Sequence, residues 1–270
     1  MRVLLAGAAG CRARAAQKFA IFLPMDRPHG PGKGRPQEYR GPLAPNQIAD
    51  GINATIRNAR RLAADAKILL EAGRLPTAAA IAALSIEESG KVSILRGFAT
   101  ATKPEQVRAA WRDYRNHRSK NGAWILPDLV RGGARRLADL APTVEQNGEH
   151  TALLNSLKQL GLYTDCYGNA HWSEPANMFA GKEASLAKHL VATAELLARA
   201  TEVTVREIEL WIEHLGPVWG TAEMPNGLLR WATAMHREGL TSATPEEYAR
   251  FMFGELALSE WKTKPPAGEH

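Results

Sequence analysis

The stretch "WRDYRNHRSKNG", residues 111–122, carries residue types that could do chemistry on RNA. In it Arg112 stands five positions before His117. A neutral imidazole can take the proton of an RNA 2′-hydroxyl, and a protonated imidazole can give a proton to the leaving oxygen. A guanidinium can hold the scissile phosphate through paired hydrogen bonds and stabilise its growing charge. The pair therefore indicates phosphodiester cleavage, with no metal ion and no cofactor required.

The spacing of this pair sets a condition on the structure. Two residues five positions apart point about 140° away from each other on a regular helix. Arg112 and His117 can therefore share a site only at a helix end, at a distortion, or with the help of a second chain. Asp113 stands four positions before His117 and would face the same way. The alternative interpretation is a solvated basic helix with a surface histidine.

A second candidate cluster interrupts the apolar stretch "AAIAALSIEESGKVSIL", residues 79–95, with Glu87, Glu88, Gly90 and Lys91. An ionised carboxylate on a closely packed helix must find a cation or a hydrogen-bond donor, or become neutral. A simple ion pair on the helix surface is the alternative. We expect one carboxylate to point into the bundle, towards a partner on a neighbouring helix.

The neighbouring segment offers such partners. A carboxylate such as Glu88 could orient Arg112 or tune His117. Gly90 costs roughly 1 kcal/mol against alanine inside a helix. Close approach of another helix would explain why a glycine stands there.

The net charge of +6 belongs to the N-terminal tail. Residues 1–40 hold eight Lys/Arg and two Asp/Glu, which leaves 26 of each sign for residues 41–270. The high isoelectric point is therefore poor evidence that the folded body binds nucleic acid. A local excess of positive charge does occur in residues 103–136. Its basic residues are Lys103, Arg108, Arg112, Arg115, Arg118, Lys120, Arg131, Arg135 and Arg136.

Cysteine usage and hydropathy favour a cytoplasmic protein. Cys11 and Cys166 are far apart and belong to no Cys/His cluster, so neither a disulfide framework nor a zinc site is expected. No apolar run approaches the length that would span a membrane. The apolar run at the start of the chain is too short for a typical signal segment. It favours either a disordered tail or a start codon that was assigned too early. Met25 is then a candidate for the true start.

The periodicity of the body predicts an all-α fold. Proline and glycine are dense in residues 24–45, and residues 1–43 are expected to form a flexible basic extension. Apolar residues then recur every three or four positions, which predicts two long helices over 48–70 and 76–101, joined as an antiparallel hairpin. Further helices are expected over 104–120, 126–140, 148–160, 179–200, 203–215, 226–239 and 245–258, with an irregular aromatic loop at 162–175.

Three segments resemble the AbiV family of abortive infection proteins. "NARRLAADAKILLEAGRLPTAAAIAALSIEESGKVSIL", residues 58–95, is similar to the opening helix pair of that family. "RDYRNHRSK" is similar to its His-x-x-Lys region. "LGLYTDCYGNAHWSEP", residues 160–175, resembles its "lYvD…P" segment. In this order the similarities cover about residues 46–200.

The resemblance implies a fold and an activity. AbiV proteins belong to the HEPN superfamily, whose members are helical bundles that commonly dimerise. Many HEPN toxins are metal-independent ribonucleases with an Arg-x(4–6)-His motif and a polar residue after the arginine. Arg112, Asp113 and His117 match this motif. The two motifs of a homodimer would face one cleft, which would relieve the angular condition noted above.

These observations lead to one leading prediction and two alternatives. The leading prediction is a HEPN-like helical bundle over residues 44–202, with a C-terminal helical extension and short flexible tail over 203–270, acting in phage defence as an endoribonuclease toxin. The alternatives are a non-catalytic module that blocks translation or engages a phage protein, and a regulatory partner with a decayed site. The proposed supporting residues are Glu87, Glu88, Lys91 and Lys120, and the proposed RNA-binding residues are Arg108, Arg115 and Arg118.

Overall fold

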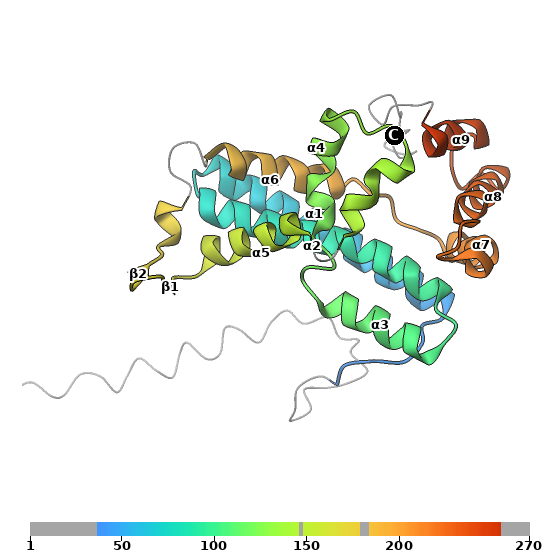
Figure 1. The fold of residues 1–270 in the computed structure, drawn as a ribbon, viewed down its shortest axis with the longest axis horizontal. Coiled ribbons are helices and arrows are strands. Elements are labelled where there is room, and N and C mark those ends of the chain that lie inside the picture. Colours follow the sequence, from blue (N-terminus) through green and yellow to red (C-terminus); the bar gives the residue numbers. More distant parts are fainter. Residues whose placement is uncertain (1–36, 146–147, 179–183, 255–270) are drawn as a thin grey trace, which may run out of the picture. The chain divides into compact units, whose positions relative to one another are not determined.

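A computed structural model describes residues 37–145, 148–178 and 184–254 (Figure 1). Most of the predicted N-terminal extension and the predicted C-terminal tail lie outside the described residues. The described part is almost entirely helical, as predicted. Its elements are α1 (Pro45–Glu71), α2 (Leu75–Thr100), α3 (Pro104–Arg115), η1 (Gly122–Ile125), α4 (Leu126–Arg131), η2 (Leu137–Val144), α5 (Glu149–Leu162), β1 (Cys166–Tyr167), β2 (His171–Trp172), η3 (Pro175–Asn177), α6 (Ala184–Leu197), α7 (Val205–Leu215), η5 (Gly216–Val218), α8 (Met224–Arg237) and α9 (Pro245–Phe253).

The long hairpin of α1 and α2 is the framework of the fold. The link between the two helices is only three residues long, and Gly73 adopts a positive φ of 72° in it. Glycine tolerates this left-handed conformation without a steric penalty, so the chain can reverse there. The buried stripe of α1 includes Ile48, Ile52 and Ile56, which confirms the predicted helical period.

Helix α2 is buried along most of its length because α1, α5 and α6 all pack against it. Its first turns present small side chains, including Ala78, Ala79 and Ala82, which are at most 1% exposed. The small side chains let the neighbouring helices approach closely. Gly161 of α5 shows how closely, since a Cβ on it would lie 2.7 Å from the carbonyl oxygen of Pro76.

Two of the predicted helices are wrong in their extent. The helix expected over 104–120 ends at Arg115, so the residues that follow form a loop. The helix expected over 126–140 divides into α4 and the 3-10 helix η2. Gly133, with a positive φ of 94°, turns the chain between them. The backbone amides of Arg135 and Arg136 then donate to the carboxylate of Asp139, which fixes the start of η2.

The loop expected over 162–175 contains a small β-hairpin. Strands β1 and β2 pair antiparallel, with Cys166 opposite Trp172 and Tyr167 opposite His171. The backbone amide of Asp165 donates to the hydroxyl of Ser173 at 2.9 Å.

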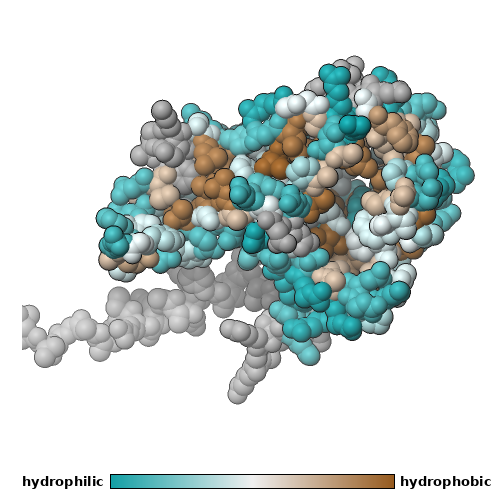
Figure 2. Space-filling model, viewed as in Figure 1, coloured by the Kyte–Doolittle hydropathy of each residue, from teal (hydrophilic) through white to brown (hydrophobic). Residues whose placement is uncertain are grey.

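The C-terminal helices α7, α8 and α9 share a second core around Trp211 and Trp231. Side-chain hydroxyls of Thr204 and Thr244 cap α7 and α9. Asn53 of α1 joins this part to the bundle, since its amide exchanges two hydrogen bonds with the backbone of Val203. Among the described helices, none is both long and apolar enough to cross a membrane. Figure 2 shows hydrophobic residues, in brown, exposed in patches on one face among hydrophilic residues, in teal.

Candidate active site

The end of α3 releases His117 from the helix. Asn116 has an extended ψ of 125°, and its backbone amide still bonds to the carbonyl oxygens of Arg112 and Asp113. The Asn116 side chain accepts a hydrogen bond from the backbone amide of Arg118 at 3.1 Å, which closes a tight turn around His117. The helix end therefore turns His117 away from α3, but it does not bring the imidazole to Arg112.

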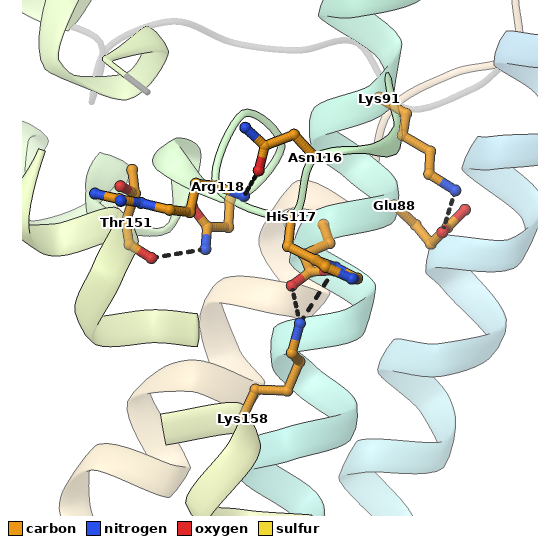
Figure 3. A network of polar contacts seen from close by, with 9 residues as sticks. Glu88, Lys91, Asn116, His117, Arg118, Thr151 and Lys158 are labelled. Carbon is orange, nitrogen blue, oxygen red and sulfur yellow. Dashed lines mark hydrogen bonds and ion pairs between the residues drawn. The ribbon is translucent and has the colours of Figure 1, made fainter. Parts of the chain in front are cut away.

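In the turn, the His117 side chain faces α2 (Figure 3). Its Nδ1 lies 2.6 Å from Oε2 of Glu87. The side chain of His117 is 57% exposed, whereas that of Glu87 is 5% exposed. The contact therefore joins a solvent-facing imidazole to a buried carboxylate.

Lys158 of α5 completes the cluster. Its Nζ lies 2.5 Å from Oε1 of Glu87 and 3.3 Å from Nδ1 of His117. The Lys158 side chain is 5% exposed. A buried charge is tolerated when it is paired and hydrogen bonded. Glu87 and Lys158 meet this requirement for each other, and the second oxygen of Glu87 is left for the imidazole.

The geometry of this cluster assigns the tautomer of His117. A carboxylate accepts hydrogen bonds and cannot donate one, so the 2.6 Å contact with Glu87 places a hydrogen on Nδ1, and the ammonium of Lys158, which is also a donor, then makes no hydrogen bond to that nitrogen. The lone pair of the neutral ring then lies on Nε2, which makes no hydrogen bond to a described residue. A carboxylate that fixes one nitrogen of a histidine in this way leaves the other free to take or give a proton.

The second carboxylate of α2 has a different role. Glu88 pairs with Lys91 on its own helix at 2.5 Å, and the Nζ of Lys91 also lies 5.0 Å from the ring centre of Tyr114. The suggestion that Glu88 tunes His117 is therefore wrong, because Glu87 makes that contact. The expectation that one carboxylate of the pair points inward to a neighbouring helix agrees with the position of Glu87.

Gly90 lets the loop after α3 lie directly on α2. A Cβ on Gly90 would lie 1.7 Å from the carbonyl oxygen of Lys120. The sequence suggested the close approach of a helix at this glycine, and the structure places a loop there. Lys120 itself is 6% exposed. Burial, and next the charge of Lys91, lower the pKa of its ammonium.

The arginines of this region lie in different surroundings. Arg108 and Arg112 are exposed on α3. The guanidinium of Arg115 lies 4.9 Å from the ring centre of Trp111. Arg118 has a buried Nε without a hydrogen-bond partner.

Arg112, the arginine of the motif, does not contact His117. Within the described residues no hydrogen bond joins the Arg112 side chain to His117. Asp113 lines a cavity beside α2 and makes no contact with the imidazole. The chain thus brings together His117, Glu87 and Lys158, and leaves Arg112 on the exposed surface of α3.

Lys158 was not among the predicted site residues, although its position in the sequence is unusual for a lysine. The buried face of α5 is formed by Thr151, Leu154, Lys158 and Gly161. A lysine at a position of that apolar period is an anomaly, because lysine is almost never buried without a partner. The pattern could have indicated an acidic partner for Lys158 in the core.

The site contains no cluster suited to a metal. Among residues 37–145, 148–178 and 184–254, no group of three or more His, Cys, Asp or Glu is arranged to hold a metal ion.

Comparison with known proteins identifies the family. The profile of the HEPN family AbiV matches residues 47–200, more than half of the chain. Comparisons with curated proteins and with solved structures gave no match. The matched region contains the α1–α2 hairpin, the turn that carries His117 and the helix that carries Lys158. The chain belongs to the AbiV family of HEPN proteins.

Proposed function

We propose that this protein is an abortive infection toxin that cleaves RNA without a metal ion. Membership of the AbiV family supports the role in abortive infection, a defence against phage. The observation that carries the ribonuclease proposal is the exposed imidazole of His117, held at Nδ1 by buried Glu87. This arrangement fixes the orientation of the ring and leaves Nε2 open to a substrate.

The reaction follows from these groups. In its neutral form His117 takes the proton of a 2′-hydroxyl at Nε2, while the 2′-oxygen attacks the adjacent phosphorus. The bond from phosphorus to the 5′-oxygen breaks, and a protonated imidazole gives its proton to that oxygen. The products are a 2′,3′-cyclic phosphate and a 5′-hydroxyl. Such acid–base assistance typically contributes about 10²- to 10⁴-fold in rate.

Arg112 is proposed to bind the scissile phosphate. It is exposed on α3, one turn before the loop that carries His117. The two residues do not touch within one chain, which favours a homodimer in which two motifs line one groove. Size-exclusion chromatography with light scattering tests this part; a monomer at micromolar concentration that still cleaves RNA would contradict it.

The basic surface around the site supports RNA as the substrate. Arg108 and Arg112 are exposed side chains, and we expect them to contact phosphates. Arg115 stacks on Trp111 and Arg118 is partly buried, so we expect them to contribute less. The slope of log affinity against log salt concentration is negative, and each phosphate contact that is lost should make it less steep by about 1.

The test is cleavage of labelled RNA by purified protein in EDTA. Wild type should cleave, and His117→Ala and Arg112→Ala should lose cleavage together with toxicity in cells. The matched controls are His171→Ala, an exposed histidine of the β-hairpin, and Arg61→Ala, an exposed arginine of α1; both should behave as wild type. Growth arrest with intact RNA in the His117→Ala strain would overturn the proposal and support a non-catalytic module that blocks translation or engages a phage protein.

A further inference from the structure

A cavity of about 800 Å³ lies beside the C-terminal half of α2, apart from the cluster of His117, Glu87 and Lys158. Residues of α2, of α3 and of the loop after α3 line it. Most of its lining is apolar or small. The apolar lining residues that matter here are Val92, Ile94, Ala109, Ala110 and Val144.

One end of the cavity holds polar groups that lack partners. Lys120 lines it and is 6% exposed. Among the residues that the structure describes, none accepts a hydrogen bond from its ammonium or forms an ion pair with it. The hydroxyl oxygens of Ser89 and Ser119, two further lining residues, are buried and also have no hydrogen-bond partner.

A second cation lies further along the same cavity. Arg96 is stacked on the indole rings of Trp211 and Trp231, with distances of 4.8 and 5.4 Å from its guanidinium carbon to the two ring centres. It has no ion pair with a described residue. Burial lowers the pKa of Arg96. Asp113 is the only carboxylate among the described lining residues, so positive charge prevails in the cavity.

Burying these polar groups costs folding free energy unless a hydrogen-bond acceptor or an anion contacts them. A buried donor without an acceptor forfeits the free energy of its hydrogen bonds to water. Burying the ammonium of Lys120 is costlier still, and the charges of Glu87 and Glu88 offset that cost only in part, since its pKa is lowered by burial. An anion placed against Lys120 would give acceptors to the ammonium and to both hydroxyls, while the apolar walls would cover an apolar body. Pockets of this size and composition are typical of small-molecule sites.

We propose that this cavity binds a small organic anion with an apolar body. Lys120, Ser89 and Ser119 hold the anionic group, and the walls formed by α2 and α3 enclose the rest. This inference does not rest on RNA cleavage, because none of the three groups contacts the imidazole of His117, although the charge of Lys120 acts on Glu87 and Lys158. It assigns the chain a ligand site beside the loop that carries the histidine.

The experiment uses a fluorescent anion with these properties, 8-anilinonaphthalene-1-sulfonate, titrated into the full native chain. We expect saturable binding with one probe per chain. Lys120→Met should weaken it by about tenfold or more, the loss of one charged contact. N-phenyl-1-naphthylamine, which has the same apolar body and no sulfonate, should bind more weakly and with equal affinity to wild type and Lys120→Met.

Two further variants make the test independent of folding. Gly97 lines the cavity, and a Cβ on it meets nothing within 4 Å. Gly97→Leu should therefore fill the cavity and abolish probe binding while α2 stays intact. Lys103→Met removes an exposed lysine ahead of α3 and should leave binding unchanged.

Some outcomes would overturn the proposal. No saturable binding to wild type would mean that the cavity is covered, for example by a second copy. Equal binding to wild type, Lys120→Met and Gly97→Leu would mean that the probe attaches elsewhere as an adventitious additive only. Circular dichroism of each variant shows whether the fold is retained, and no RNA enters any of these measurements.

Discussion

Oε1 of Glu87 lies 2.5 Å from Nζ of Lys158, and both side chains are 5% exposed. The two residues are 71 positions apart, on α2 and α5, so the contact ties two helices of the bundle together. Each charge has the other as its buried counter-charge. The carboxylate is therefore held in one place, and its second oxygen holds His117.

The buried pair predicts a large loss of stability when one member is removed. Glu87→Gln and Lys158→Met should each lower the free energy of unfolding by about 3–5 kcal/mol, because the other charge stays buried without its partner. The double variant should lose much less than the sum of the two. Urea denaturation of the four proteins measures this. Additive losses would contradict the pairing.

Glu88 is the natural control for that series. It is also on α2, but its side chain is 18% exposed and it pairs with Lys91, whose side chain is 16% exposed. Glu88→Gln should therefore cost less than Glu87→Gln, because water still reaches the charge that is left alone.

The contact with Glu87 predicts the tautomer of His117. In the neutral ring the hydrogen should be on Nδ1, and Nε2 should carry the lone pair. A long-range proton–nitrogen correlation spectrum distinguishes the two nitrogens, with His117→Ala used to assign the signals. In Glu87→Gln the amide can also donate, so we expect a mixture of tautomers. A wild-type spectrum with the hydrogen on Nε2 would show that the assignment is wrong.

Gly90 and Gly97 form a matched pair on one helix. Gly90→Ala forces the loop that carries His117 and Lys120 away from α2, since the new Cβ meets the Lys120 carbonyl oxygen. We expect a loss of about 1–3 kcal/mol, as for other overpacking substitutions, and a loss of RNA cleavage. A Cβ at position 97 meets nothing within 4 Å, so Gly97→Ala should raise the free energy of unfolding by about 1 kcal/mol through helix propensity. Thermal denaturation of both variants provides the comparison.

Lys120 predicts a specific dependence of stability on pH. Its pKa is lowered in the folded chain, and the unfolded chain keeps the ordinary value of 10.5. Between these two values the unfolded chain binds more protons, so the contribution of Lys120 to stability rises as the pH rises. Below the folded pKa the buried ammonium is destabilising. Lys120→Met should therefore be more stable than wild type at pH 7.

The advantage of Lys120→Met should shrink as the pH approaches 10.5, the ordinary pKa of lysine. Denaturation curves of wild type and variant at several pH values give this difference directly, and the effects of titrating groups that do not interact with Lys120 cancel in it. A difference that stays constant with pH would mean that the ammonium is solvated in the folded chain.

Much of the fold could be predicted because long helices repeat their pattern many times. The stripe of Ile48, Ile52 and Ile56 fixed α1, and the short link at Gly73 fixed the hairpin. The break in the helix expected over 126–140 falls at Gly132 and Gly133, where two residues of low helix propensity stand together. The end of α3 at Arg115 has a weaker local mark, Asn116, whose side chain closes the next turn, and the loop beyond it packs on Gly90.

The site was predictable only in part. The charges on α2 and the histidine after α3 stand out in the sequence, but Glu87 and Glu88 differ by one position, or about 100° around the helix. The sequence did not decide which of them faces the bundle. Lys158 is 71 positions away from Glu87, and its pairing depends on how α5 packs against α2.

The rate of RNA cleavage by the Glu87→Gln/Lys158→Met variant tests the central claim most directly, because this variant leaves no charge of the pair buried alone. The rate is measured in EDTA under single-turnover conditions, with RNA affinity measured alongside. We predict a fall of about 10²-fold or more in the rate, with RNA affinity unchanged, since His117 loses its orientation and keeps its access to substrate. A wild-type rate in this variant would contradict the claim that the buried pair prepares His117 for catalysis.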